Sequence, residues 1–292
     1  MANKYHVRSI SLPTRSHPST IRVEEELRKL KNWEGTFTPT STADSIHTGL
    51  SLLEDLYLCL DDLLNMASTQ QVISNHKGNK CVEDVLDGSM RILDICGITR
   101  DTMLQIKENV QALHSTLRRR KGESSVETSV AEYKFFTKMM KKNVNKSITS
   151  LRHMDGRFGV SPLLDLDHHL AAVIRVLREA ILMNLSVFQF ILSFLTVPSP
   201  NSKATKWLVV AKLMHKGVKP CEDNSENVNE LQCVESALNT LLNEGTNDEK
   251  MQVAHERLQA LENAIEIVEN GLESVFRRLI KTRATLLNII SK

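Results

Sequence analysis

The densest group of potential metal ligands in the sequence is Asp165, Asp167, His168 and His169. On a helix, Asp165 and His169 lie four residues apart and could share one face, whereas the adjacent histidines point about 100° apart. A zinc site needs three or four converging ligands, and the sequence offers no second cluster to complete the set. We therefore interpret the acids as partners of a helix N-terminus, whose dipole favours negative charge. No metal or cofactor is predicted.

Other signatures of catalysis are missing from the sequence. It contains no Gly-rich phosphate loop, no GxSxG and no HExxH motif. Catalytic residues that are distant in the sequence can also come together in the folded protein, so an enzyme is a further, less favoured interpretation. The formal net charge of +2 argues against a dedicated nucleic-acid binder. The sequence therefore favours a non-enzymatic protein with protein partners, no small-molecule substrate and no specific nucleic acid.

A candidate phosphorylation motif lies near the start of the chain and comprises Arg8, Ser9, Ser11 and Pro13. An arginine three residues before Ser11 suits basophilic kinases, and the pattern Arg-Ser-x-Ser-x-Pro resembles the phosphopeptide that 14-3-3 proteins bind. A phosphate on Ser11 would add about −1.5 to −2 charge for an arginine cluster to grip. Pro13 would then turn the chain out of the binding groove. The alternative is a merely soluble tail, because short motifs of this kind often occur by chance.

Two basic stretches could form a positively charged surface. A basic amphipathic helix can bind calmodulin or an anionic membrane surface, and the alternative is a bundle helix whose lysines face water. Docking of the helix over 134–152 to an anionic membrane is therefore the alternative to a scaffold. The basic residues are Arg118, Arg119, Arg120 and Lys121 at one helix end, and Lys134, Lys138, Lys141, Lys142 and Lys146 on the next helix.

The most apolar run in the sequence, residues 180–197, carries no charge. Its length reaches the lower limit of about 18 to 20 residues for a transmembrane helix. At about 100° per residue, however, its polar residues continue one stripe from the preceding charged turn, and a lipid-facing span has no reason to keep such a stripe. We expect the central helix of a bundle, with a membrane helix or a partner-binding face as alternatives, and a hydrogen-bond partner for Asn184. The stripe comprises Arg175, Arg178, Glu179, Ser186, Gln189, Ser193 and Thr196.

Apolar residues at helical spacing recur along the chain after about residue 20. A helix over 80–120 keeps heptad register from Val82 to Leu117, and the C-terminal helix keeps it from Met251 to Ile289. Residues 246–249 predict a capping box before the C-terminal helix, and Gly88 and Gly97 predict a close helix approach or a bend.

The predicted fold is therefore all-α: an elongated antiparallel multi-helix bundle with long coiled-coil-like helices and a disordered N-terminal arm. The arm is basic, rich in Ser and Arg, and covers residues 1–20, whereas a single bundle domain covers residues 21–292. Loops are expected near residues 34–44, 155–162, 198–204 and 215–227.

The cysteines predict a reducing compartment. They are scattered through helical patterns without a CxxC pair, which is typical of buried cytosolic thiols, and no apolar signal region follows Met1. We expect a cytoplasmic protein, with peripheral membrane association as an alternative. The first 23 residues contain no acid and also fit a plastid transit peptide, a less favoured interpretation. The cysteines are Cys59, Cys81, Cys96, Cys221 and Cys233.

Five segments carry a resemblance to a known family. They are YHVRSISLPTRSHP near the N-terminus, VEDVLDGSMRILDICG, LRRRKG, KWLVVAKLM and LESVFRRLIKTRATLLNI near the C-terminus. Together, in the same order and over essentially the whole chain, they resemble the plant-specific BYPASS-related family, many of whose members are catalogued only as a domain of unknown function. The resemblance implies a land-plant source, a helical fold and a link to root and shoot development, which for the namesakes involves restraint of a mobile root-derived signal. It implies no catalytic residues.

Overall fold

The computed structural model describes residues 17–37, 42–119, 123–155, 166–196, 228–245 and 247–292. These residues form α-helices joined by turns, so the all-α prediction is confirmed. The helices are α1 (Ile21–Thr36), α2 (Ala43–Asn65), α3 (Ala67–Ser74), α4 (Lys80–Arg118), α5 (Glu123–Asp155), α6 (His168–Thr196), α8 (Glu230–Glu244) and α9 (Asp248–Ser291).

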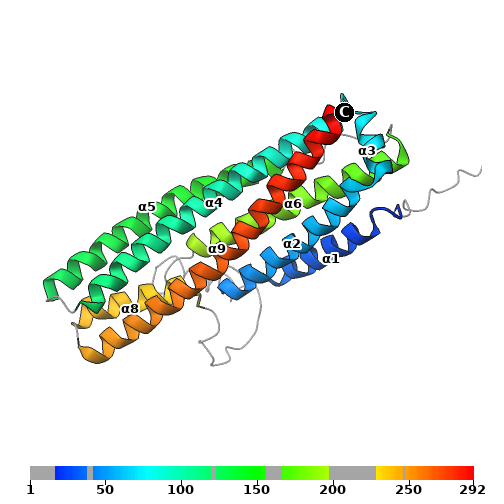
Figure 1. Cartoon of the computed structure of the whole chain (residues 1–292). Helices are drawn as coiled ribbons and strands as arrows, with labels where there is room; N and C mark the ends of the chain where they lie inside the picture. The colour runs from blue at the N-terminus through cyan, green and yellow to red at the C-terminus, as the bar shows by residue number, and fades with distance from the viewer. Residues whose placement is uncertain (1–16, 38–41, 120–122, 156–165, 197–227, 246) are drawn as a thin grey trace, which may run out of the picture.

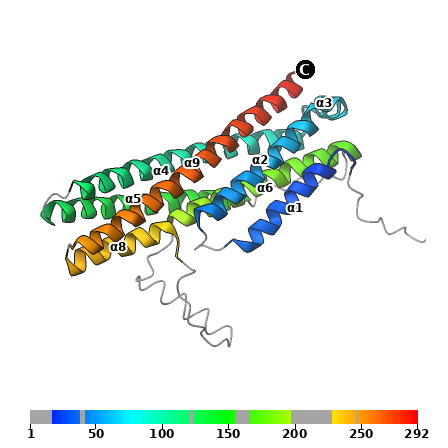
Figure 2. The same cartoon turned by 60° about the horizontal axis from the view of Figure 1, so that its bottom comes forward.

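The long helices form an elongated antiparallel bundle, as predicted (Figure 1). Helices α4 and α5 lie side by side along one flank, α1 and α2 lie along another, and α9 contacts both α2 and α4. At one end, α8 packs against α9 as the other arm of a hairpin (Figure 2). At the opposite end, the short helix α3 packs on α6 and α9.

Helix α6 lies at the centre of the bundle, where it contacts α1, α2, α3, α4 and α5. Among the described helices it alone is long and apolar enough to cross a membrane, yet 61% of its apolar window is buried inside the protein. The predicted polar stripe forms a half-buried edge, except that Arg178 is buried, with its Nη2 3.4 Å from Asp84 Oδ2 of α4. The prediction of a buried bundle helix with one polar edge is confirmed.

Two buried polar contacts connect α2 with its neighbours. Asn184 is fully buried on α6, and its Nδ2 donates to Tyr57 Oη of α2 at 2.9 Å and to the Ala180 carbonyl at 2.7 Å. The predicted partner of Asn184 is therefore present, although its Oδ1 has no hydrogen-bond partner. On α9, Thr282 Oγ1 donates to Asp61 Oδ1 of α2 at 3.0 Å. Because an unpaired buried polar group costs about 1–3 kcal/mol, these contacts favour one register of α2 against α6 and α9.

The apolar faces predicted for the two longest helices lie in the core. In α9 the predicted series is buried from Ala254 to Ile289, and Met251 is half-buried. In α4 the predicted series is buried except at Ser89, which is half-buried. Helix α9 contacts α2, α3, α4 and α8, so its stripe packs into a bundle with several neighbours.

Local features differ from the sequence prediction at three places. Periodicity does not predict α3, because its 8 residues are too few to show a helical repeat. Residues 17–20, which the prediction assigns to the arm, form a turn before α1. The N-cap of α9 is Asn247, whose side chain accepts from the Lys250 N–H at 2.8 Å, whereas the predicted Thr246 lies outside the described residues. The predicted loops at 198–204 and 215–227 lie outside the described residues.

A glycine lets α1 and α2 approach closely. A Cβ atom at Gly49 of α2 would lie 2.4 Å from the Trp33 ring of α1. That ring cannot withdraw freely, because its Nε1 donates to the Ser45 carbonyl at 3.0 Å. At Gly97 of α4, by contrast, a Cβ atom would meet nothing within 4 Å. Of the two alternatives predicted for Gly97, the close helix approach is therefore wrong, whereas a close approach does occur at Gly49.

Replacing Gly49 with alanine should lower the free energy of unfolding by about 1–3 kcal/mol, because the added methyl group overpacks the Trp33 contact. The matched variant Gly97→Ala should raise it by up to about 1 kcal/mol, because alanine has the higher helix propensity and the space is open. Urea unfolding followed by circular dichroism measures both. A Gly49→Ala variant as stable as the wild type would contradict the close packing of α1 on α2.

Candidate functional site

Half of the first basic stretch and the whole phosphorylation motif lie outside the described residues. Arg120 and Lys121 lie outside these residues, as does the motif at residues 8–13. Arg118 and Arg119 are exposed at the end of α4, where Arg118 Nη2 donates to Gln259 Oε1 of α9 at 3.3 Å. The role of Ser11 therefore remains a prediction from the sequence.

The second basic stretch divides into two groups on α5. Lys134 and Lys141 are half-buried and bond to side chains of α8, whereas Lys138, Lys142 and Lys146 are exposed. Because all five lysines lie within 13 residues of one helix, the division follows from their angular positions, which differ by about 100° per residue. The fold thus places part of the predicted basic surface in a contact with α8.

A groove of about 380 Å³ lies between α5 and α8, next to the end of α6. Its volume falls within the range of about 300–1,000 Å³ that is typical of small-molecule sites. Apolar side chains from all three helices line it together with lysines, one glutamate and one asparagine. The lining residues are Tyr133, Lys134, Thr137, Lys138, Lys141, Leu195, Leu231, Glu235, Leu238 and Asn239.

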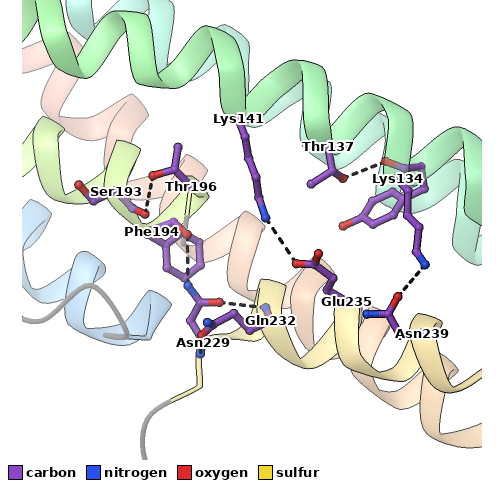
Figure 3. Close-up of polar contacts among 11 residues, drawn as sticks. Lys134, Thr137, Lys141, Ser193, Phe194, Thr196, Asn229, Gln232, Glu235 and Asn239 are labelled. Carbon is purple, nitrogen blue, oxygen red and sulfur yellow. Dashed lines mark hydrogen bonds and ion pairs between the residues drawn. The ribbon is translucent and has the colours of Figure 1, made fainter. Parts of the chain in front are cut away.

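Polar contacts bridge the groove from α5 to α8 (Figure 3). Lys134 Nζ donates to Asn239 Oδ1 at 2.6 Å, and Lys141 Nζ lies 3.4 Å from Glu235 Oε2, a long and partly exposed ion pair. The third lining lysine, Lys138, is exposed at the same wall. Among the described lining residues, three lysines therefore accompany one carboxylate, which gives this lining a net positive charge.

Asn229 connects the end of α6 to the start of α8 and so holds two groove-lining helices together. It is fully buried, and its Nδ2 donates to the Phe194 carbonyl of α6 at 3.2 Å (Figure 3). Its Oδ1 accepts from the Gln232 N–H at 3.0 Å, while Gln232 Oε1 accepts from the Asn229 N–H at 3.0 Å. This capping box satisfies donors at the start of α8, and the bond to Phe194 satisfies an acceptor near the end of α6.

Two buried acidic groups remain protonated at neutral pH. Burial raises the pKa of the Tyr133 phenol, which lines the groove, to about 12. Burial likewise raises the pKa of the Cys96 thiol to about 12, which disfavours the reactive thiolate. Cys59 and Cys81 are also buried and free, and Cys233 is half-buried and free, as predicted for reduced thiols. Cys221 lies outside the described residues.

The described candidate metal ligands, Asp167, His168 and His169, lie at the start of α6. Asp167 Oδ1 accepts from the backbone N–H groups of His169 at 2.9 Å and Leu170 at 3.3 Å, and these bonds hold the pKa of Asp167 below its usual value. The His169 ring stacks on that of His17, with 4.3 Å between centroids. No metal-binding group of three or more ligands occurs within the described residues. The predicted role of Asp167 at a helix N-terminus is confirmed, and Asp165 lies outside the described residues.

A second surface lies on the outer side of α5, and we call it the α5 stripe. It comprises Phe135, Met139, Lys142 and Lys146, whose spacings of four, three and four residues place them on one helix face. The side chain of Phe135 is 69% exposed and that of Met139 is 44% exposed. Exposure of large apolar side chains to water has a free-energy cost, which packing among the described residues does not remove here.

Sequence reasoning did not identify the α8 side of the groove. Asn229 and Gln232 have the three-residue spacing of a capping box, so that local signal was available. By contrast, Asn239 lies 105 residues from its partner Lys134, and Glu235 lies 94 residues from Lys141. Helical periodicity cannot reveal such pairs, because they depend on how α5 and α8 pack.

Comparison with known proteins gives one result. A family model described as Protein BPS1 matches residues 49–289, which is most of the chain. The chain belongs to the BPS1 family. This confirms the resemblance to the BYPASS-related plant proteins, and membership supports a role in the regulation of plant development. Neither the curated proteins nor the solved structures gave a match. The match to the BPS1 family covers α3 to α8 completely, and with them both sides of the groove.

Replacing Asn229 with alanine should lower the free energy of unfolding by about 1–3 kcal/mol, because it removes a helix cap and leaves the buried Phe194 carbonyl without this donor. The control is Asn247→Ala, which removes the exposed cap of α9 and should cost only about 0.5–1 kcal/mol. Urea unfolding measures both. Equal losses would show that the bond between α6 and α8 adds nothing to stability.

Proposed function

We propose that this protein is a non-enzymatic scaffold that regulates plant development by binding partners. The observation that carries the proposal is that buried and half-buried ionisable side chains bond from one helix to another. His114 Nδ1 of α4 lies 2.8 Å from Glu262 Oε1 of α9, and Lys107 Nζ lies 2.6 Å from Glu269 Oε2 on the same pair of helices. Such contacts hold the bundle together. They support a structural use of these groups over a catalytic one.

The N-terminal arm is the proposed regulatory element. Phosphorylation of Ser11 by a basophilic kinase would create a ligand for a 14-3-3 protein, with Arg8 as the kinase determinant and Pro13 as the exit turn. The described chain begins at His17, at the end of the bundle where α6 starts, so the arm leaves from a defined position on the bundle. A 14-3-3 protein bound to the phosphorylated arm would add a further protein-binding surface to the scaffold.

Treating the protein with a basophilic kinase should allow recovery on immobilised 14-3-3, and Ser11→Ala should reduce that recovery at least about tenfold, because charge-assisted hydrogen bonds to the phosphate are lost. Ser16→Ala, another serine of the arm outside the motif, is the control and should retain recovery. Quantitative blotting of the bound fraction gives the result. Equal recovery of the Ser11→Ala variant would exclude the switch.

Docking to an anionic membrane is a second candidate function, which the α5 stripe favours. Between Tyr133 and Ile148 the sequence contains five lysines and no acid. Phe135 and Met139 lie on the outer face with Lys142 and Lys146 beside them, so apolar insertion and charge attraction would act on the same side of the helix. The protein would be a peripheral membrane scaffold, cytoplasmic in location.

The double variant Lys142→Gln/Lys146→Gln should weaken binding to phosphatidylserine vesicles by roughly 30-fold at low salt, because each lysine near such a surface contributes about 1 kcal/mol. Phe135→Ser should weaken it further. Vesicle flotation provides the measurement, and Lys80→Gln/Arg257→Gln is the control that removes two exposed charges elsewhere. If both double variants float alike, or the wild type stays unbound at low salt, membrane docking through α5 is wrong.

A further inference from the structure

We propose that the groove between α5 and α8 binds a small amphipathic anion, a molecule with one carboxylate-like head group and an apolar body. The ligand would be held without chemical change, so the proposal adds a binding site to the scaffold and requires no catalytic group. It concerns the side of α5 that faces α8, and Lys138 lies where this side borders the α5 stripe.

The apolar part of the groove provides the first argument. Leu195 of α6, and Leu231 and Leu238 of α8, line it together with the Tyr133 ring. Burial of the apolar body of a ligand against these side chains would release water from apolar surface. This release favours binding by about 25 cal/mol per Å² of apolar surface buried. The volume of about 380 Å³ suits a small molecule, whereas a helix of a protein partner would need a longer groove.

Charge provides the second argument. Among the described residues that line the groove, three lysines (Lys134, Lys138 and Lys141) accompany one carboxylate, that of Glu235, so this lining has an excess of positive charge. Because opposite charges across a site favour binding, the groove selects an anion over a neutral or cationic molecule of the same shape. Tyr133 remains neutral because burial raises its pKa to about 12, so it adds no negative charge.

The geometry of the lysines allows an anion to enter. The contact from Lys141 to Glu235 is long, at 3.4 Å, and both side chains are partly exposed, so it contributes little and can be exchanged. Lys138 is exposed at the rim, where its ammonium group can reach a head group at the mouth while the apolar body lies deeper. Asn239 accepts from Lys134 through Oδ1, which leaves its Nδ2 as a further donor for a carboxylate.

Isothermal titration calorimetry with monomeric dodecanoate tests the proposal on the full-length protein. Dodecanoate should bind, and uncharged dodecanol and cationic dodecyltrimethylammonium should bind at least about tenfold more weakly, because a charge-assisted hydrogen bond contributes about 1.5–3 kcal/mol. Equal affinity for the alcohol would overturn the assignment of the lysines. If the protein binds phosphatidylserine vesicles but not monomeric dodecanoate, its preference for anions belongs to membrane docking. That result would overturn the proposed binding site in the groove.

Two lysines on the same helix give a matched pair of variants. Lys138→Gln removes a charge from the groove wall and should weaken dodecanoate binding about tenfold, whereas Lys142→Gln removes the same charge from the outer face and should change it less than about twofold. Equal effects of the two variants would overturn the proposal, because they would reveal a general effect of net charge.

Filling the groove gives an independent test. Thr137 is half-buried in the wall, and its Oγ1 bonds only locally, to the Tyr133 carbonyl at 2.9 Å. Thr137→Trp should therefore abolish dodecanoate binding, with thermal unfolding by circular dichroism as the check that the bundle remains folded. A folded Thr137→Trp variant with wild-type affinity would overturn the proposal. If this variant does not fold, the comparison of Lys138→Gln with Lys142→Gln decides the outcome.

Discussion

The structure depends on the removal of α6 from water. This helix is apolar over most of its circumference, and each large side chain that becomes buried contributes about 1.5–3 kcal/mol. Five other helices contact it, and each has an apolar stripe that is likewise stabilised by burial from water. The helix has the length and composition of a membrane span, yet its apolar surface is covered mostly by protein side chains within the bundle and does not need lipid.

Apolar packing alone would permit several registers between such helices, and polar contacts in the interior distinguish among them. The amide of Asn184 donates a hydrogen bond to Tyr57, and Asp61 accepts one from Thr282. These bonds fix α2 against both α6 and α9. A displacement by one turn would leave these groups unpaired in a dry environment, which is costly.

The groove follows from the way α8 is attached. Asn229 binds the end of α6 while it caps α8, and two lysines of α5 bond to side chains farther along α8. Because lysine side chains are long, they bridge α5 and α8 without the close apolar contact that fills the rest of the bundle. Space therefore remains between the two helices, lined by leucines and by charged side chains. The outer face of α5 has no such partner within the described chain, and Phe135 remains exposed there.

The sequence by itself determined the long helices, the buried face of each and the central place of α6, because apolar spacing repeats with the helix period and depends only on neighbouring residues. The heptad series of α9 and the pairing expected for Asn184 were predictable in this way. Only the tertiary structure decided that Lys134 and Lys141 belong to a groove while Lys142 belongs to an outer surface. Likewise, it placed the close approach of helices at Gly49 and not at Gly97. Such contacts join residues distant in the chain, and their distances depend on how whole helices pack.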